Sequence, residues 1–583
     1  MSLTINITAD MQSSQKLRRE RQRSLMMMQK PNQRSLRTVT VGAIAVVIVS
    51  ALTTLALRRE RLIDAWRPTN YNVSITLNDS LTEITQAQTD IDIVALKPLQ
   101  VVDLDFGELK TDSVTLNDKP VPFLHQNGKL QVTLPTTFAP KTSLKISVTY
   151  HGKPKDGLIL SKDKDGKPSV VGDNWPDRVH HWIPCFDHPS AKATITFRVS
   201  APSRDIVVAN GHLTKVETND PGRKTWTYSE GAPIPPYCMV IGVGEFARLE
   251  APQSPVSPLS FYVPQSDAAY APKGFSSAAS ALQMFNEKVG PYPYEKLALI
   301  IGATQFGGME NSSAIVFPGT LFNPNPNQTL SKAFDIRSGI EDVVAHEIAH
   351  QWFGDSVTES TWADLWLSEG FATYFSGLFI EMHEGEEAFQ QYLKRAADTA
   401  LGYEEKNRIP IHDRDTQDLF KLLNGNNYQK GAWVLHMLRS RLGDEAFFQG
   451  IRSYYQQHKN SIASTEDLRL ALEKASGKDL QTFFTRWVYD SGHPQYDVQW
   501  SWQANSKRLD VVTTQKQPGA VFLDEIPLAV TTANGTRYFK LRPQAKRASE
   551  TFRMDEQPIS VVVDPNNTLL KELTVSGNQY HPR

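Results

Sequence analysis

Short runs of apolar residues fill the chain from about Tyr71 to Glu250, and Asn, Asp, Gly or Pro interrupts them every ten residues or so. Examples are YNVSITL, IDIVALK, LKISVTY and ATITFRVSAP, in which β-branched residues recur. Runs of this composition, bounded by turn residues, are typical of strands joined by tight connections. The pattern therefore predicts an N-terminal antiparallel β domain over residues 62–250.

After Pro272 the apolar positions take up helical spacing, as in VVAHEIAHQWFG, FATYFSGLFIEMHEG and YQKGAWVLHMLRSRLG. Several of these segments end on glycine, which commonly follows the last turn of a helix. We expect a mainly helical domain over residues 251–491. Strand-like runs then return in LDVVTTQKQ, IPLAVTTANGTRYFKLRP and PISVVVDPN, with a turn at Asn534-Gly535. They predict a small β-sandwich over residues 492–583 and, with the other two regions, an α+β multidomain fold.

One uncharged segment of 20 residues, Thr38–Leu57, follows a basic stretch over residues 1–37. At 1.5 Å per residue a helix of this length crosses a bilayer core of about 30 Å. The basic flank favours a cytoplasmic N-terminus. The segment predicts one transmembrane helix over 38–57 behind a cytoplasmic tail, with the rest of the chain extracytoplasmic, either periplasmic or extracellular. A cleaved signal peptide is the competing interpretation, although its basic region would be unusually long and no clean A-x-A site follows.

Composition narrows the functional classes. A chain of 583 residues is too long for one core. Its formal charge of −1 provides no basic field, which argues against a nucleic-acid partner. Cys185 and Cys238 cannot form a disulfide framework or a CxxC metal site. They form one bridge in an oxidising compartment or remain two buried thiols.

The segment HEIAH carries the clearest chemical signal. In a helix, residues i and i+4 lie on one face, so His346 and His350 can direct their imidazoles at one point. Neutral imidazoles are good ligands for Zn²⁺, and Glu347 lies beside that point. Glu369 follows in WLSEG and can supply a third ligand. Two histidines and one glutamate leave a fourth position open, as in catalytic zinc sites, where Glu347 would act as general base.

HEIAH followed by WLSEG resembles the aminopeptidase N type of gluzincin zinc peptidase, the family that includes leukotriene-A hydrolase. A second segment, FGGMENSSAIVFP, is similar to the G-x-M-E-N exopeptidase motif of that family. The resemblance implies that Glu310 binds the free ammonium of a peptide's first residue. Pairing with a carboxylate in a water-poor site would exclude chains whose N-terminus is blocked. The matching motif positions are Gly307, Gly308, Met309, Glu310 and Asn311.

Two further segments carry the resemblance. NNYQKGAWVLHML is similar to the Y-E-K-G-A segment of the family, which implies that Tyr428 donates a hydrogen bond to the oxyanion of the tetrahedral intermediate. HHWIPCFDHPSAKATITF resembles a segment of the family's N-terminal domain, where Asp187 and Lys192 are expected to be structural. Many relatives have a glutamine about ten residues before Pro184 that helps to hold the substrate amine. Here Asn174 or Asp173 is the candidate replacement, or Glu310 acts alone.

The resemblance covers about Tyr71 to Leu570 and implies a thermolysin-like catalytic domain followed by an immunoglobulin-like β-sandwich. The resemblance does not extend to the large C-terminal helical domain that many relatives carry. The resulting hypothesis is a membrane-anchored aminopeptidase that holds one Zn²⁺ per chain through His346, His350 and Glu369 and acts on peptides with a free N-terminus. A thermolysin-like endopeptidase would use the same zinc ligands without a need for GGMEN. A membrane-anchored binding protein on an inactivated peptidase scaffold is the alternative from another class.

Overall fold

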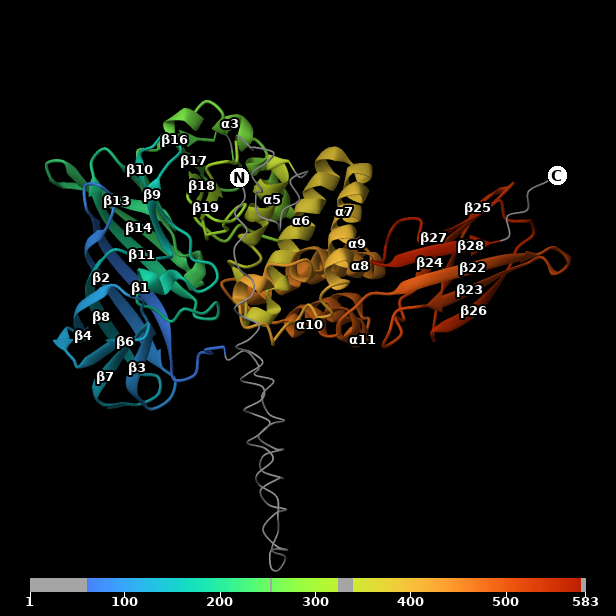
Figure 1. The fold of residues 1–583 in the computed structure, drawn as a ribbon, viewed down its shortest axis with the longest axis horizontal. Coiled ribbons are helices and arrows are strands. Elements are labelled where there is room, and N and C mark those ends of the chain that lie inside the picture. Colours follow the sequence, from blue (N-terminus) through green and yellow to red (C-terminus); the bar gives the residue numbers. More distant parts are fainter. Residues whose placement is uncertain (1–59, 252–253, 323–338, 578–583) are drawn as a thin grey trace, which may run out of the picture. The chain divides into compact units, whose positions relative to one another are not determined.

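The computed structural model describes residues 60–251, 254–322 and 339–577. All of them belong to one compact unit, 58–583. The described residues begin with β strands, continue through a helical region and end in two further sheets (Figure 1).

The N-terminal region contains three sheets. The largest has the strand order β13-β14-β11-β1-β2-β8-β4-β5. Along these strands buried positions alternate with more exposed ones, and the apolar residues at the buried positions form the core around Tyr71, Val73 and Ile75. The bounds in the large sheet are β1 Trp66–Leu77, β2 Ile84–Ala95, β4 Lys110–Leu116, β5 Lys119–Pro120, β8 Ser143–Gly152, β11 Ala193–Pro202, β13 His212–Asp220 and β14 Arg223–Ile234.

Two smaller sheets complete this region, in the orders β12-β15-β10-β9 and β3-β7-β6. Their bounds are β3 Leu99–Asp105, β6 Phe123–Gln126, β7 Lys129–Phe138, β9 Leu158–Lys162, β10 Pro168–Gly172, β12 Ile206–Ala209 and β15 Ile241–Gly244. The predicted antiparallel β domain is confirmed except for one pair, because β1 and β11 run parallel. More than a hundred residues separate these strands, so no hairpin forces them to be antiparallel.

A four-stranded sheet opens the region that was predicted to be mainly helical. Its order is β16-β17-β18-β19, with bounds β16 Ala247–Glu250, β17 Leu259–Val263, β18 Leu297–Gly302 and β19 Ala314–Pro318. The last three strands are parallel. Parallel strands are buried on both faces, so LALIIG and AIVFP show no alternation that would reveal them in the sequence.

The helices of this region pack around α5 and α6, which contact each other along their length (Figure 1). Helix α10 has the expected ends, with a capping box at Ser464 and Gly477 in the left-handed conformation after its last turn. The α-helical bounds are α3 Ala271–Gly274, α4 Ala278–Lys288, α5 Ile340–His350, α6 Trp366–Glu384, α7 Glu386–Glu404, α8 Gly431–Leu442, α9 Asp444–His458, α10 Thr465–Ser476 and α11 Gln481–Phe484. Two π-helical turns, η6 Asn426–Lys430 and η7 Thr485–Tyr489, and the short parallel pair β20 Val357–Glu359 and β21 Ser461–Ala463 complete it.

The C-terminal strands form two sheets that share an apolar core, in the orders β26-β23-β22-β28 and β25-β24-β27. The predicted turn at Asn534-Gly535 joins β24 to β25. The bounds are β22 Gln495–Gln503, β23 Arg508–Gln515, β24 Ile526–Thr532, β25 Gly535–Leu541, β26 Arg547–Arg553, β27 Ser560–Val563 and β28 Glu572–Gly577.

The predicted membrane topology requires correction. Within residues 60–251, 254–322 and 339–577, no helix is both long enough and apolar enough to cross a bilayer. Helices α6 and α7 have 19 residues each, but charged residues interrupt both, and α6 buries its apolar side chains inside the protein. The predicted span over 38–57 lies outside the described residues. The assignment as a single-pass protein with an extracytoplasmic catalytic domain is therefore withdrawn.

The two cysteines are free thiols, and both are buried. Lys192 is structural, as expected. Its ammonium donates to the carbonyl oxygens of Asp355 and Ser356, at 2.7 Å each, and to Thr358 Oγ1 at 2.8 Å. Lys192 lies directly before β11, so these hydrogen bonds connect the start of β11 to the loop that follows α5.

Candidate active site

Three predicted ligands converge between α5 and α6. The Nε2 atoms of His346 and His350 lie 3.0 Å apart, and Glu369 Oε2 lies 3.4 Å from the first and 3.3 Å from the second. All three side chains are buried. Glu369 Oε2 accepts no hydrogen bond within the described chain. One buried, unsatisfied carboxylate oxygen facing two imidazole nitrogens is the arrangement that a metal ion would complete.

The surroundings of His350 favour its use as a ligand. Its Nδ1 atom donates to the carbonyl oxygen of Phe353 at 3.1 Å and lies 3.0 Å from Ser368 Oγ. A proton on Nδ1 leaves the lone pair of Nε2 directed at the site. Ser368 precedes Glu369, so the same contact also joins the second ligand to the third.

The charges of the site attract a cation. Burial alone would lower the pKa of His350, but Glu369 and Glu310 raise it to about 10. Burial works to raise the pKa of Glu369, yet the two histidines lower it to about 2. Burial lowers the pKa of His346 to about 4, which keeps that imidazole neutral. Glu369 is therefore charged and His346 neutral, and a divalent ion would take the place of the proton that the carboxylates stabilise on His350.

Glu347 and Gly308 are in direct contact. A Cβ atom built on Gly308 would lie 2.3 Å from Glu347 Oε1, so any larger residue there would displace this carboxylate. Glu347 is buried, and its burial raises the pKa of this carboxyl well above its usual range. Gly308, the second glycine of GGMEN, is thus needed for steric reasons, because the absence of a side chain lets the segment approach Glu347.

The GGMEN segment brings Glu310 into the same cavity. The segment forms a short bridge to β19, in which the backbone N–H of Met309 donates to Val316 O at 2.8 Å and the N–H of Val316 donates back at 2.9 Å. Burial raises the pKa of Glu310 to about 7, against the opposing effect of His350. Met309 also lines the cavity. Gly307 and Asn311 are buried in the segment but are not among the residues that line the cavity.

Tyr428 reaches the site from the π-helical turn η6. Its hydroxyl donates to Glu369 Oε1 at 2.7 Å, and its ring stacks on the imidazole of His346. Burial and the carboxylate of Glu369 raise the pKa of Tyr428 well above its ordinary value, so the phenol keeps its proton. A Cβ atom on Gly431, the first residue of α8 directly after η6, would lie 3.0 Å from Gly370 Cα, so two glycines allow this junction to approach α6 closely. π-Helical turns are frequent at functional sites.

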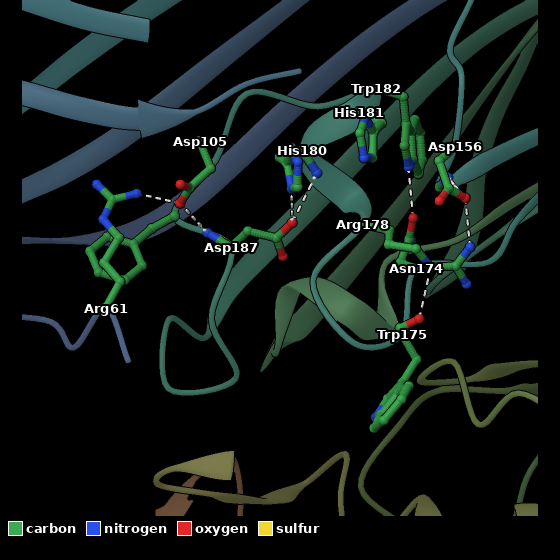
Figure 2. Close-up of polar contacts among 12 residues, drawn as sticks. Arg61, Asp105, Asp156, Asn174, Trp175, Arg178, His180, His181, Trp182 and Asp187 are labelled. Carbon is green, nitrogen blue, oxygen red and sulfur yellow. Dashed lines mark hydrogen bonds and ion pairs between the residues drawn. The ribbon is translucent and has the colours of Figure 1, made fainter. Parts of the chain in front are cut away.

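Asn174 does not reach the cavity. Its amide donates to Met239 O, and its Oδ1 accepts from Trp182 Nε1 at 2.8 Å. Figure 2 shows that the side chain of Trp175 leaves the chain in the opposite direction, and Trp175 lines the cavity. Asp173 pairs with Arg178 at 3.2 Å and does not line the cavity either. The structure therefore does not bring the proposed replacements for the missing glutamine to the substrate amine.

Residues that the sequence did not indicate also shape the site. Gln351, directly after His350, donates to Glu310 O at 3.1 Å and to Asp355 Oδ2 at 2.9 Å, and its Oε1 accepts from the N–H of Ser313 at 2.7 Å. The amide of Gln351 thereby connects the end of α5 to the backbone at Glu310 and at Ser313. Phe306, directly before the GGMEN motif, also lines the cavity, as do Trp175 and Leu423, which lie in no motif that marks them as cavity residues. The position of Gln351 next to a ligand was the one available signal.

Comparisons with known proteins agree with this geometry. Residues 274–487 match the Peptidase family M1 domain, and residues 67–238 match the Peptidase M1 N-terminal domain. The chain belongs to peptidase family M1. The M1 zinc metallopeptidase of Deinococcus radiodurans, whose crystal structure is known, is 27% identical, with a TM-score of 0.60 over 73% of this chain and 93% of that one. Zinc is accordingly the cofactor that these comparisons support.

Curated relatives include the Tricorn protease-interacting factor F2 of Thermoplasma acidophilum and the Aminopeptidase M1 of Arabidopsis thaliana. The first is 28% identical over 76% of this chain and 56% of its own length. The second is 30% identical over 55% of this chain and 36% of its own length. This M1 chain spans about half the length of the curated relatives it matches, or less.

Proposed function

We propose that this M1 chain is a zinc-dependent aminopeptidase that hydrolyses the first peptide bond of peptides with a free N-terminus. The observation that carries the proposal is the presence of Glu310 in the same cavity as His346, His350 and Glu369. A ligand set alone fits many zinc hydrolases, whereas a buried carboxylate beside it suits a substrate ammonium.

The side chains divide the work. Zinc held by the two histidines and Glu369 would act as a Lewis acid toward the scissile carbonyl and lower the pKa of water. Glu347 accepts the proton of the attacking water and delivers it to the leaving amine. Tyr428 turns its hydroxyl from Glu369 toward the oxyanion. Glu310 pairs with the ammonium and fixes the cleavage point one residue away, without help from Asn174.

The proposal includes a domain division. An N-terminal β domain over 62–250, a thermolysin-like peptidase domain over 251–491 and an immunoglobulin-like β-sandwich over 492–583 are supported by the grouping of the sheets. The pairing of β16 with β17 across residue 250 supports a start of the peptidase domain slightly before that point. Two sheets of four and three strands support the sandwich.

The test is hydrolysis of a panel of aminoacyl fluorogenic amides, each with a free or an N-acetylated amine, with and without a chelator. We expect turnover of the free-amine amides only, its loss on chelation and its return with Zn²⁺. Glu310→Gln should raise KM for the free-amine substrates by at least ~10-fold because the amide carries no charge for the ammonium. Equal cleavage of acetylated and free substrates would overturn the proposal in favour of an endopeptidase.

A further inference from the structure

One wall of the active-site cavity carries no charge. Among the described residues that line it, the proposed function already uses Glu310, Glu347, Tyr428 and the three zinc ligands. Apart from Gly308, the remaining lining residues are Trp175, Phe306, Met309 and Leu423. These four come from the N-terminal region, the segment that carries Glu310 and the loop before η6, so they face the cavity from three parts of the fold.

We propose that this wall receives the side chain of the substrate's first residue, and that Trp175 restricts it to small and medium-sized uncharged side chains. The inference rests on the proposed function. With the ammonium on Glu310 and the first carbonyl at the zinc ligands, the Cα atom lies between them. Its side chain must then point at the part of the lining that neither group occupies, which is the apolar wall.

The chemistry of the wall excludes charged side chains. No lysine, arginine, aspartate or glutamate stands among its four members, and the proposed function already assigns the acidic residues elsewhere in the described lining to the metal, the ammonium and proton transfer. A guanidinium, ammonium or carboxylate placed there would lose its hydrating water and gain no hydrogen-bonding or ionic partner, which is strongly unfavourable. Apolar side chains have no such hydration to lose, and they gain contact with the indole of Trp175 and the thioether of Met309.

The fixed position of Trp175 limits the size of the side chain that the wall can receive. Trp175 is only 2% exposed, so it has no open space to rotate into. Its carbonyl oxygen accepts from Arg178 Nε at 2.8 Å, and its indole packs edge-on against Phe306, Trp362 and Phe420 at centroid distances of 5.9, 5.8 and 5.7 Å.

The experiment compares aminoacyl amides that differ only in the first residue: Ala, Met, Leu, Phe, Trp, Arg and Glu. For the unmodified protein we expect kcat/KM for Ala and Met to exceed that for Arg, Glu and Trp by at least ~10-fold, the range that pocket contacts can supply. Trp175→Ala should raise kcat/KM for Trp and Phe relative to Ala by at least ~10-fold. Arg and Glu should remain poor substrates, because the enlarged wall still offers no charge.

Two variants keep the test decisive. Trp175→Phe retains an aromatic ring in the packing and should shift the size preference in the same direction by a smaller factor, even if Trp175→Ala fails to fold. Trp502→Ala, at a half-buried tryptophan of β22, should leave the ranking unchanged. A preference of the unmodified protein for Arg or Glu would overturn the inference, and so would an unchanged ranking in the folded Trp175 variants. Failure to cleave any free-amine amide would refute the proposed function itself, and this inference with it.

Discussion

At the scale of single residues, the site separates binding the metal from moving the proton. His346 and His350 lie one helical turn apart and face the same point, while Glu347 projects beside them against Gly308. The order of residues in HEIAH therefore serves two purposes on one helix. Substitutions at neighbouring positions should have different consequences, and these can be measured separately.

Glu347→Gln should abolish turnover while the protein keeps its zinc. Glutamine has nearly the same shape but cannot accept the proton of the attacking water, so we expect kcat to fall by at least ~10²-fold. Zinc content, measured by atomic absorption, should stay near one per chain because Glu347 is not among the three proposed ligands. Glu341→Gln, an exposed position on the same helix, is the matched control and should leave both quantities unchanged. Retained turnover in Glu347→Gln would refute the assignment of the base.

Gly308→Ala tests the steric contact. The added methyl group would lie 2.3 Å from Glu347 Oε1, so the carboxylate must move away from the reacting water. We expect kcat to fall by roughly 10–100-fold, the scale of an ångström-sized misplacement, with zinc content unchanged. Gly319→Ala is the control, because its Cβ would meet nothing within 4 Å. If kcat of Gly308→Ala matched that of the control, the close approach would have no catalytic meaning.

At the scale of secondary structure, α5, α6 and η6 form the frame of the site. Gly370 and Gly431 touch where α6 passes the junction of η6 and α8, and this contact sets the separation between Glu369 and Tyr428. The side chain of Lys430 strengthens the frame, since its buried ammonium pairs with Glu404 of α7 and donates to Gly492 O at 3.2 Å. The turn that carries Tyr428 is thus fixed by its packing against α6 and by the contacts of Lys430 with Glu404 and Gly492.

Gly431→Ala should disturb this frame without touching a ligand. The new Cβ would lie 3.0 Å from Gly370 Cα, so the junction of η6 and α8 must shift and withdraw the Tyr428 hydroxyl from its position. We expect a fall in kcat of about 10-fold or more with little change in KM, because Tyr428 acts in the transition state. Gly402→Ala, at an open position of α7, should leave kcat unchanged. An equal fall in KM and kcat would indicate that the frame does not position Tyr428.

How far the sequence predicts these elements depends on how local the signal is. Helical periodicity predicts that His346 and His350 share one face of α5, whereas the arrival of Glu369 from α6 depends on how the two helices pack. The strands β18 and β19 escape prediction because full burial removes their alternation. Asn174 and Trp175 differ by one position, and only the path of the backbone decides which of them reaches the cavity. The roles of Gln351 and Leu423 depend on contacts between distant segments, which no local pattern records.

At the scale of the whole molecule, ion pairs join the helical region to the last strand. His493 Nδ1 lies 2.7 Å from Glu404 of α7, and its Nε2 lies 2.8 Å from Glu572 of β28. Glu404 also binds Lys430, so a continuous series of charges connects the C-terminal sheets to the turn that carries Tyr428. With carboxylates at both of its nitrogens, His493 is best satisfied as an imidazolium.

This series of charges should make stability depend on pH. Burial alone would lower the pKa of His493, but Glu404 and Glu572 raise it above its ordinary 6.5. The stabilisation is therefore fully present below pH 6.5 and is lost as the pH rises through the raised pKa. Burial works to raise the pKa of Glu404, yet His493 and Lys430 lower it to about 2. Its contribution is present above about pH 4.5 and is lost as the pH falls toward 2.

His493→Gln should accordingly lower the midpoint of thermal unfolding most at about pH 6, by a few degrees, since 1 kcal/mol corresponds to roughly 2–4 °C. Toward pH 9 the difference from the unmodified protein should shrink, because the neutral imidazole loses its advantage over an amide between two carboxylates. Unfolding curves at pH 5, 6, 7, 8 and 9 measure this trend, with His383→Gln at an exposed position of α6 as the control. A difference that stays constant from pH 6 to 9 would show that His493 acts through packing. The charge connection between the C-terminal sheets and the active-site turn would then have no part in stability.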